Sequence, residues 1–233
     1  MKVIAIIPAF NEEATIKMVI NEIRQYEDID VIVINDGSKD RTSIIARETG
    51  TPVIDFNKNQ GIGLAMKAGY QYAKERDYDI AIQVDADGQH DISKINELIF
   101  MIEEKEYDMV IGSRYIVKTG HVSSFIRYLG IKYFSALLYI FHKKSIKDTT
   151  SGYRAVNKHI INYFAEYYPP YYPEVPTLSN LMSQDKKICE IPVDMRRRQA
   201  GKSSISFFDS FHYLIKITYI CIKERISYRK GEK

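Results

Sequence analysis

Residues 80–90 read Ile-Ala-Ile-Gln-Val-Asp-Ala-Asp-Gly-Gln-His, an apolar run that ends in two closely spaced carboxylates. The run is rich in β-branched residues and is almost continuously apolar, which is typical of a strand covered on both faces in a parallel sheet. Similar runs occur at residues 3–7, 31–34, 53–55 and 109–111. The first 112 residues therefore predict five buried strands, the fourth of them at residues 80–84.

Helical patterns lie between these runs. Residues 12–26 place four apolar residues on one helical face, and further helices are predicted at residues 41–48, 62–75 and 93–104. Asp40 and Asp91 are N-cap candidates for two of them. Strands that alternate with helices of this length predict βαβ units and a mostly parallel sheet, in a three-layer α/β sandwich.

After residue 112 the regular alternation of strand and helix patterns ends. It predicts a loop at 113–123, an amphipathic helix at 125–142, a short strand at 153–156, a rigid turn region at 167–176, a last strand at 189–193 and an amphipathic helix at 206–229. The turn region is rich in proline and tyrosine, and residues that precede proline disfavour the helical conformation. We expect one domain over residues 1–205, with a basic amphipathic helix appended at 206–233.

Composition and charge exclude several classes of protein. The net charge of +3 is too small to indicate a nucleic-acid partner, although basic residues crowd the last forty positions. Two distant cysteines predict neither a disulfide framework nor a zinc site, and favour an intracellular protein. No run of about 18 uncharged apolar residues occurs, so we expect no membrane-spanning helix.

Polar motifs follow the first two predicted strands. Residues 8–13 read Pro-Ala-Phe-Asn-Glu-Glu and residues 35–40 read Asn-Asp-Gly-Ser-Lys-Asp. A ligand of an open parallel sheet binds outside the carboxyl ends of its strands, so both motifs are candidates for contact with a nucleotide. Asp36 could accept hydrogen bonds from a base edge or a ribose hydroxyl. The alternatives are a simple turn with Glu12 in the first helical turn, and an Asx turn at Asp36.

The strongest signal is the acidic motif after the fourth strand. Asp85 and Asp87 would repel each other there unless a cation compensated them. Mg²⁺ or Mn²⁺ suits one or two carboxylates when a diphosphate supplies the remaining oxygen ligands. The alternative is a plain acidic turn at Gly88, and His90 is interpreted as a loop residue and not as a ligand. Residues 59–65 add a glycine-bearing loop before a helix, which suits close approach of an anion but lacks the full dinucleotide fingerprint.

These motifs, in this order, resemble those of the family 2 glycosyltransferases with the GT-A (nucleotide-diphospho-sugar transferase) fold. Residues 111–114 (Ile-Gly-Ser-Arg), 148–154 (Asp-Thr-Thr-Ser-Gly-Tyr-Arg) and 196–204 (Arg-Arg-Arg-Gln-Ala-Gly-Lys-Ser-Ser) are similar to segments of the dolichyl-phosphate mannose synthase-like branch. The acceptors of that branch are polyprenyl phosphates. The resemblance implies a nucleotide-binding part at residues 1–112 and an acceptor part at residues 113–205.

The resemblance also implies roles for individual residues. The nucleotide sugar would be bound by Pro8, Ala9, Phe10, Glu12, Asp36, Asp85, Ala86 and Arg114. The metal would be bound by Asp85, Asp87 and Gln89, with Asp87, Arg127 and Arg198 as the catalytic residues. Arginine suits bidentate phosphate recognition, and the alternative for Arg114 and Arg127 is a solvated or paired loop charge.

One departure from the family bears on the acceptor. Members that glycosylate a sugar hydroxyl usually have an acidic pair near residues 172–176, where this chain has only Glu174. A hydroxyl needs a general base, whereas a phosphate monoester is largely ionised at neutral pH because its second pKa is about 6. The sequence thus favours an inverting transfer from a UDP- or GDP-linked sugar to a polyprenyl phosphate.

Three other functions stay open. The enzyme could elongate a lipid-linked oligosaccharide or a capsule or cell-wall polysaccharide, with Glu174 or Asp148 as the base. It could be a nucleotidyltransferase, although these normally begin with a glycine-rich basic loop. It could also be a non-catalytic nucleotide-sugar-binding or scaffold protein.

The apolar and aromatic stripe of the helix at 206–229 is flanked by lysine and arginine. It is either core or a membrane-surface contact. We expect a cytoplasmic protein that is peripheral on the inner face of the membrane, with an integral-membrane protein as a further candidate partner.

Overall fold

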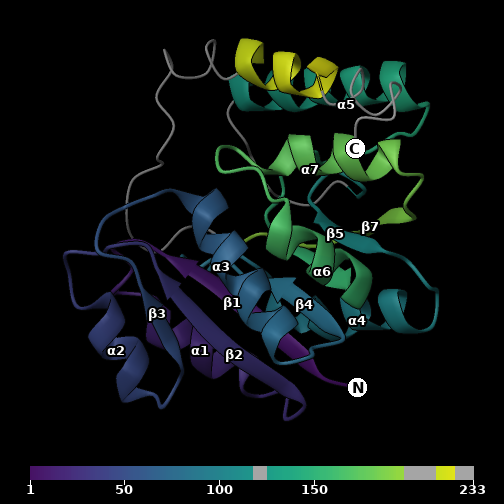
Figure 1. Cartoon of the computed structure of the whole chain (residues 1–233). Coiled ribbons are helices and arrows are strands. Elements are labelled where there is room, and N and C mark those ends of the chain that lie inside the picture. The colour runs from purple at the N-terminus through teal and green to yellow at the C-terminus, as the bar shows by residue number, and fades with distance from the viewer. Residues whose placement is uncertain (118–124, 197–213, 224–233) are drawn as a thin grey trace.

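A computed structural model describes residues 1–117, 125–196 and 214–223. Its centre is a seven-stranded sheet in the order β3-β2-β1-β4-β6-β5-β7 (Figure 1). The strands are β1 (Val3–Ala9), β2 (Ile29–Asn35), β3 (Val53–Asp55), β4 (Ile80–Gln83), β5 (Met109–Ser113), β6 (Arg154–Asn157) and β7 (Ile188–Pro192). Among the described strands only β6 runs antiparallel, against both β4 and β5, so the prediction of a mostly parallel sheet is confirmed.

Helices cover both faces of the sheet. The helices are α1 (Ile16–Ile23), α2 (Thr42–Glu48), α3 (Ile62–Glu75), α4 (Ile95–Glu103), α5 (Phe125–His142), α6 (Lys158–Glu166) and α7 (Glu174–Ser183). Alternate residues of β1 enter two different cores: Ile7 packs with residues of α1, α2 and α4, and Ile6 packs with residues of α3, α6 and α7. These two cores make the three-layer sandwich that the apolar strands predicted.

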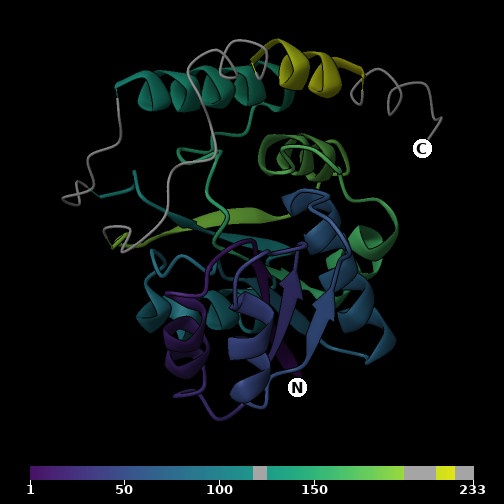
Figure 2. The same ribbon diagram turned by 90° about the vertical axis from the view of Figure 1, so that its left-hand side faces the viewer.

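A third, smaller core lies beyond α7. Phe134 of α5 and Val175 of α7 pack with Ile217 and Cys221 of the helical segment at residues 214–223. Figure 2 shows α5 and this segment side by side as an outer layer. Residues 206–213 and 224–229 of the predicted C-terminal helix lie outside the described part of the chain. No helix among the described residues is long and apolar enough to cross a membrane.

The predicted first helix begins too early, because α1 starts at Ile16 and not at residue 12. The preceding backbone is held in a turn by polar side chains of the neighbouring loop. The N–H groups of Asn11, Glu12 and Glu13 donate to Ser38 Oγ, Thr42 Oγ1 and Asp40 Oδ2, respectively. Asp40 also accepts from Thr42 N–H, but it lies one residue before the N-cap position of α2, which is Arg41. Asp91 accepts from Ser93 N–H and is the N-cap of the short 3-10 helix Ile92–Lys94 that precedes α4.

The predicted turn region at residues 167–176 is wrong in its last three residues, which form the first turn of α7. Pro176 is the third residue of this helix. Proline is tolerated in the first turn because its missing N–H would have no partner within the helix. The restriction on residues before proline therefore does not exclude a helix that begins at Glu174.

Candidate active site

The three polar motifs meet at one edge of the sheet. Strands β2, β1 and β4 are neighbours and run in the same direction, so their carboxyl ends lie together. Ala9, at the end of β1, pairs with Asn35 of β2, and Ala9 O accepts a 2.8 Å hydrogen bond from Asp36 N–H. The order of the strands therefore brings the three motifs to the same edge.

The loop after β1 is bound tightly to the loop after β2. Asn11, which has a positive φ of 56°, donates from N–H to Ser38 Oγ and accepts from Lys39 N–H, both at 2.9 Å. Pro8 and Ala9 end β1, and the Phe10 ring beyond them is exposed. An exposed aromatic ring on a fixed backbone is suited to pack against a planar base or a sugar.

Asp36 lies at the same edge but is already engaged with the protein. Its side chain is only 4% exposed, and its two carboxylate oxygens accept from Gln60 N–H at 2.7 Å and Gly61 N–H at 2.8 Å. Asp36 therefore orders the loop before α3. Each oxygen keeps a second lone pair, so contact with a ligand stays a prediction.

Two glycines permit the close packing around this loop. At Gly37, which has a φ of +69°, an added Cβ would lie 2.4 Å from the Lys58 backbone. At Gly63 in α3, an added Cβ would lie 2.3 Å from Pro169 O. The start of α3 thus rests directly on the turn before α7, which joins the two parts of the domain.

The acidic motif after β4 brings two half-buried carboxylates to the edge. Asp85 Oδ1 accepts from Gln83 Nε2 at 3.2 Å, and Asp87 Oδ1 accepts from Gln89 N–H at 3.0 Å. Ala86, between them, is buried. The Gln89 side-chain amide donates to Arg196 O at 3.2 Å, and Arg196 N–H donates to Gln89 O at 2.9 Å.

His90 is a loop residue, as predicted, but its contacts were missed. It is 2% exposed, and its Nδ1 accepts a 3.1 Å hydrogen bond from Asp85 N–H. Its ring is stacked on Tyr153, with the ring centroids 4.7 Å apart. The five-residue spacing across Gly88, which has a φ of +72°, was a signal that the chain folds back on Asp85.

The electrostatics of the edge keep Asp85 ionised. Burial acts to raise the pKa of Asp85, but His90, Gln83 and Arg114 together outweigh it and hold the pKa below its ordinary value. An ionised, half-buried carboxylate is a suitable ligand for a hard divalent cation.

Arg114 is placed differently from the expectation that it faces a phosphate. Its guanidinium and the Asp148 carboxylate form a buried bidentate ion pair, with Nε–Oδ2 and Nη2–Oδ1 distances of 2.6 Å. Asp148 is fully buried and needs this counter-ion. The Glu190 carboxylate in turn accepts from Lys147 N–H and Asp148 N–H at 2.8 Å. Arg114 thus matches the alternative of a paired charge, and Asp148 is not available as a base in this arrangement.

The segment at residues 148–154 forms one wall of the site. An added Cβ at Gly152 would lie 3.1 Å from Asp85 Oδ2 and 2.9 Å from Gln83 Nε2. In the sequence this segment indicated only the family resemblance, and the proximity of its glycine to the acidic site was not predicted. The glycine between Ser151 and Tyr153, just before a predicted strand, was the available signal.

Arg154 connects this wall to α7. Its guanidinium is buried and donates to Ser151 O at 2.7 Å, Glu174 O at 2.9 Å and Thr177 Oγ1 at 2.8 Å. These acceptors are all neutral. Sequence reasoning missed this residue as well, because nothing in the pattern separates a buried arginine of a strand from an exposed one.

The two other predicted arginines are not placed with their side chains. Arg127 belongs to α5, but its side chain lies outside the described part of the structure, as does all of Arg198. Their roles stay predictions.

The residues present fit a divalent cation that is shared with a ligand. The described residues contain no group of three or more His, Cys, Asp or Glu side chains that could hold an ion by themselves. Asp85 and Asp87 provide two carboxylates, and a diphosphate would supply further oxygens. That donor set is the one Mg²⁺ and Mn²⁺ take in sites they share with phosphates.

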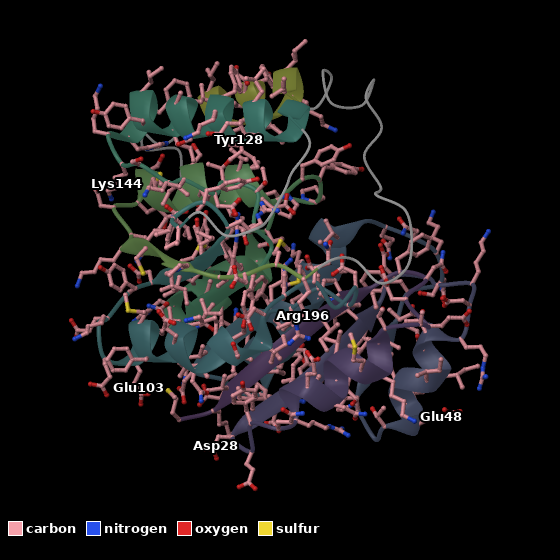
Figure 3. The ribbon with its side chains drawn as sticks, turned by 180° about the vertical axis from the view of Figure 1, so that it is seen from behind. Asp28, Glu48, Glu103, Tyr128, Lys144 and Arg196 are labelled. Atoms are coloured by element: carbon pink, nitrogen blue, oxygen red, sulfur yellow. The ribbon has the colours of Figure 1, made fainter. Side chains whose placement is uncertain are left out.

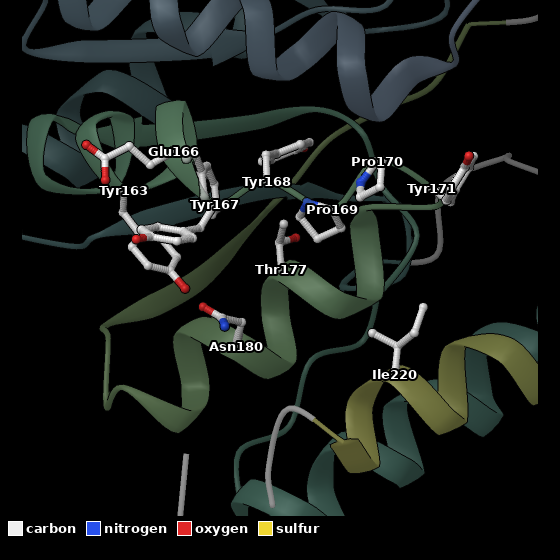
Figure 4. Close-up of a pocket in the computed structure, with 11 residues that line it drawn as sticks. Tyr163, Glu166, Tyr167, Tyr168, Pro169, Pro170, Tyr171, Thr177, Asn180 and Ile220 are labelled. Atoms are coloured by element: carbon white, nitrogen blue, oxygen red, sulfur yellow. The ribbon is translucent and has the colours of Figure 1, made fainter. Parts of the chain in front are cut away.

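A separate cavity of about 320 Å³ lies between α6, α7 and the outer helical layer (Figure 4). Tyrosine and proline residues form most of its wall, with Ile220 from the C-terminal segment and Thr177 from α7. Thr177 also accepts from Arg154, so this wall lies next to the guanidinium that supports the 148–154 segment.

Fold and site together define an α/β protein with a mostly parallel sheet and two half-buried carboxylates at the carboxyl edge of that sheet. Comparison with known proteins makes this specific. The model of the glycosyl transferase family 2 matches residues 4–164. The chain belongs to this family and is a glycosyltransferase.

Known relatives agree with the assignment to the glycosyltransferases. The undecaprenyl-phosphate mannosyltransferase of Micrococcus luteus is 28% identical over 220 residues, which is 88% of either chain. The UDP-N-acetylglucosamine–dolichyl-phosphate N-acetylglucosaminyltransferase of Methanococcus voltae is 32% identical over 185 residues, 69% of this chain and 71% of the relative.

Among solved structures, the glucosyl-3-phosphoglycerate synthase of Mycobacterium tuberculosis, in complex with Mn²⁺, UDP and phosphoglyceric acid, superposes with a TM-score of 0.71. It is 18% identical, and the match covers 97% of this chain and 78% of that one. The predicted GT-A fold is confirmed.

Proposed function

We propose that this glycosyltransferase transfers a sugar from a nucleoside diphosphate to a polyprenyl phosphate, with inversion. One oxygen of the acceptor phosphate attacks the anomeric carbon opposite the leaving diphosphate. The bond to the diphosphate oxygen breaks with its electron pair, and the nucleoside diphosphate leaves. The observation that carries the proposal is the buried Arg114–Asp148 ion pair, which removes one of the two candidate bases that a hydroxyl acceptor would need.

On the donor side, Asp85 and Asp87 would hold Mg²⁺ or Mn²⁺, with Gln89 as a further candidate ligand. The bound cation would neutralise the charge that develops on the departing diphosphate. The chain itself contributes a rigid edge: Asp36 fixes the 60–61 loop, and Gly152 lets the wall approach Asp85. Rigid placement of the donor supplies much of the rate acceleration in such a displacement.

On the acceptor side, both relatives described above are named for polyprenyl- or dolichyl-phosphate acceptors. We assign phosphate recognition to Arg127 and Arg198, because the planar guanidinium binds phosphate in a bidentate way. Replacing either arginine with lysine should then impair the kinetics with the acceptor more than it weakens donor binding.

The outer helical layer is our candidate for the membrane contact. Apolar side chains stand exposed on it, among them Leu129, Tyr139, Ile140, Ile215 and Tyr219. Neither residues 125–147 nor residues 214–223 contain an acidic residue, whereas both segments carry lysines. Tyr128, in the first turn of α5, and Lys144, just beyond its last residue, are labelled in Figure 3. An apolar surface with only basic charges suits the anionic cytoplasmic face of a membrane. An integral-membrane partner stays a prediction.

The decisive assay offers a short-chain polyprenyl phosphate and the matching free polyprenol, each with UDP- and GDP-linked sugars. We expect transfer to the phosphate only, and nearly unchanged activity of Glu174→Gln, because an ionised phosphate needs no base. Transfer to a hydroxyl acceptor but not to the phosphate, together with an inactive Glu174→Gln enzyme, would instead establish the oligosaccharide-elongating function.

A further inference from the structure

The imidazole of His90 contacts one residue twice. Its Nδ1 accepts a hydrogen bond from Asp85 N–H at 3.1 Å, and its Nε2 lies 3.3 Å from Asp85 Oδ2. A nitrogen that accepts a hydrogen bond carries no proton, so the ring proton of this tautomer is on Nε2. The ring thus holds the backbone of Asp85 with one nitrogen and presents a donor to its carboxylate with the other.

The Nε2–H group of His90 has no hydrogen-bond partner among the described residues. It is buried, and no aligned hydrogen-bond acceptor meets it among the described residues, although Asp85 Oδ2 is the nearby carboxylate oxygen. Buried polar groups normally have partners, so an unpaired one needs an explanation. A small rotation of the Asp85 carboxylate would align Oδ2 with this donor.

Further contacts hold the ring beside Asp85. One face is stacked on Tyr153 at 4.7 Å, and the His90 backbone pairs with Met195 in an isolated antiparallel bridge. The other carboxylate oxygen, Oδ1, accepts from Gln83 Nε2 at 3.2 Å. Each oxygen of Asp85 therefore has an N–H donor beside it.

We propose that His90 is a positioning residue that fixes Asp85 in the orientation in which its carboxylate receives the divalent cation of the donor site. The inference rests on the proposed metal-assisted function, because it assigns to His90 the support of a metal ligand. Residues that hydrogen-bond to metal-ligating carboxylates orient them, and their loss typically costs 10–100-fold in metal affinity.

Three substitutions separate the contacts of the ring. His90→Phe keeps a ring to stack on Tyr153 but removes both nitrogens. His90→Asn offers a side-chain oxygen near the position of Nδ1, and His90→Gln offers an N–H donor near the position of Nε2. The readout is Mn²⁺ affinity of the full chain by electron paramagnetic resonance, with UDP and with GDP present, beside nucleotide affinity in EDTA.

We expect His90→Phe to weaken Mn²⁺ binding about 10–100-fold, and the amide variants to recover part of that loss. Nucleotide affinity in EDTA should stay within about twofold of wild type in all three. A role in folding alone would lower both affinities together and would overturn the inference, as would wild-type Mn²⁺ affinity in His90→Phe. A wild-type chain that binds no Mn²⁺ with either nucleotide would instead refute the metal assignment of the proposed function.

Discussion

At the scale of single residues, the site is built from carboxylates whose surroundings give them different tasks. Asp148 is buried against Arg114, Asp36 binds two backbone N–H groups, and Asp85 and Asp87 stand half-buried at the open edge. A buried and paired carboxylate supports structure, because removing its partner leaves an uncompensated charge. The half-buried pair is the one that we propose binds a cation.

Asp87→Ala should therefore abolish transfer and leave the fold intact. The measurement is the thermal shift that Mn²⁺ adds to the shift produced by UDP or GDP. A ligand at 100 times its dissociation constant stabilises by about 2.7 kcal/mol, and the metal-dependent part of this stabilisation should vanish. The shift produced by nucleotide in EDTA is the control. Unchanged turnover of the variant with Mg²⁺ would contradict the assignment.

Asp36→Ala should have two effects. Two backbone N–H groups lose a charged acceptor, so we expect a loss of about 1–3 kcal/mol in the free energy of unfolding. The affinities for free nucleoside diphosphate and for nucleotide sugar should fall by a similar factor if Asp36 also contacts the nucleoside. Asp28→Ala, at an exposed position, is the matched control and should change neither quantity. A loss confined to the nucleotide sugar would show that Asp36 contacts the sugar instead.

Residue types and spacing were enough to predict the acidic edge, but not every partner within it. Asp85 and Asp87 could be located because two carboxylates after an apolar strand are costly without a cation. The pairing of Arg114 with Asp148 could not be predicted, since the two residues are 34 positions apart and meet only through the order of the strands. Nor could the burial of His90, which depends on Tyr153 of a distant segment.

At the scale of helices and strands, the segment before β6 matters most for the site. Gly152 lies against the Asp85 carboxylate and the Gln83 amide, with no room for a methyl group unless one of them shifts. Element boundaries near it were predicted to within a residue or two, because apolar strands are readily recognised. The start of α7 was not, because proline in the first turn obeys a different rule from proline elsewhere.

Gly152→Ala should thus lower Mn²⁺-dependent nucleotide binding at least tenfold, because an added Cβ within about 3 Å would displace Asp85 or Gln83. Gly130→Ala is the matched control. It lies in α5 with no atom within 4 Å of an added Cβ, and should stabilise the protein by about 0.5–1 kcal/mol. Equal metal affinity of Gly152→Ala and wild type would place the cation away from Asp85.

At the scale of the whole molecule, the outer layer of α5 and residues 214–223 carries apolar side chains that no described part of the chain covers. Ile140 is 62% exposed and Tyr219 is 64% exposed. We expect co-sedimentation with anionic vesicles that weakens as salt is raised, because the lysines of the layer are attracted to the lipid surface by a screened interaction.

The double variant Ile140→Asn with Tyr219→Ser should reduce this co-sedimentation at least tenfold, since each buried side chain of this size is worth about 1.5–3 kcal/mol. Ile44→Asn is the control, because Ile44 is 53% exposed on α2, outside this layer. Co-sedimentation that depends neither on anionic lipid nor on the double substitution would refute the membrane contact.

The position of β6 has a consequence for how the chain is synthesised. Strand β4, which delivers Asp85, pairs on one side with β1 but on the other with β6, whose residues 154–157 leave the ribosome more than 70 positions later. Until then β4 keeps a free edge, β5 has no neighbour, and Gly152 is missing beside Asp85. Free apolar edges recruit other strands, so a fragment that stops at residue 112 should aggregate and bind no Mn²⁺ with nucleotide. The first half of the chain holds most of the donor motifs, yet ribosome-bound chains should gain protease resistance and cation binding together, only after β6 has emerged.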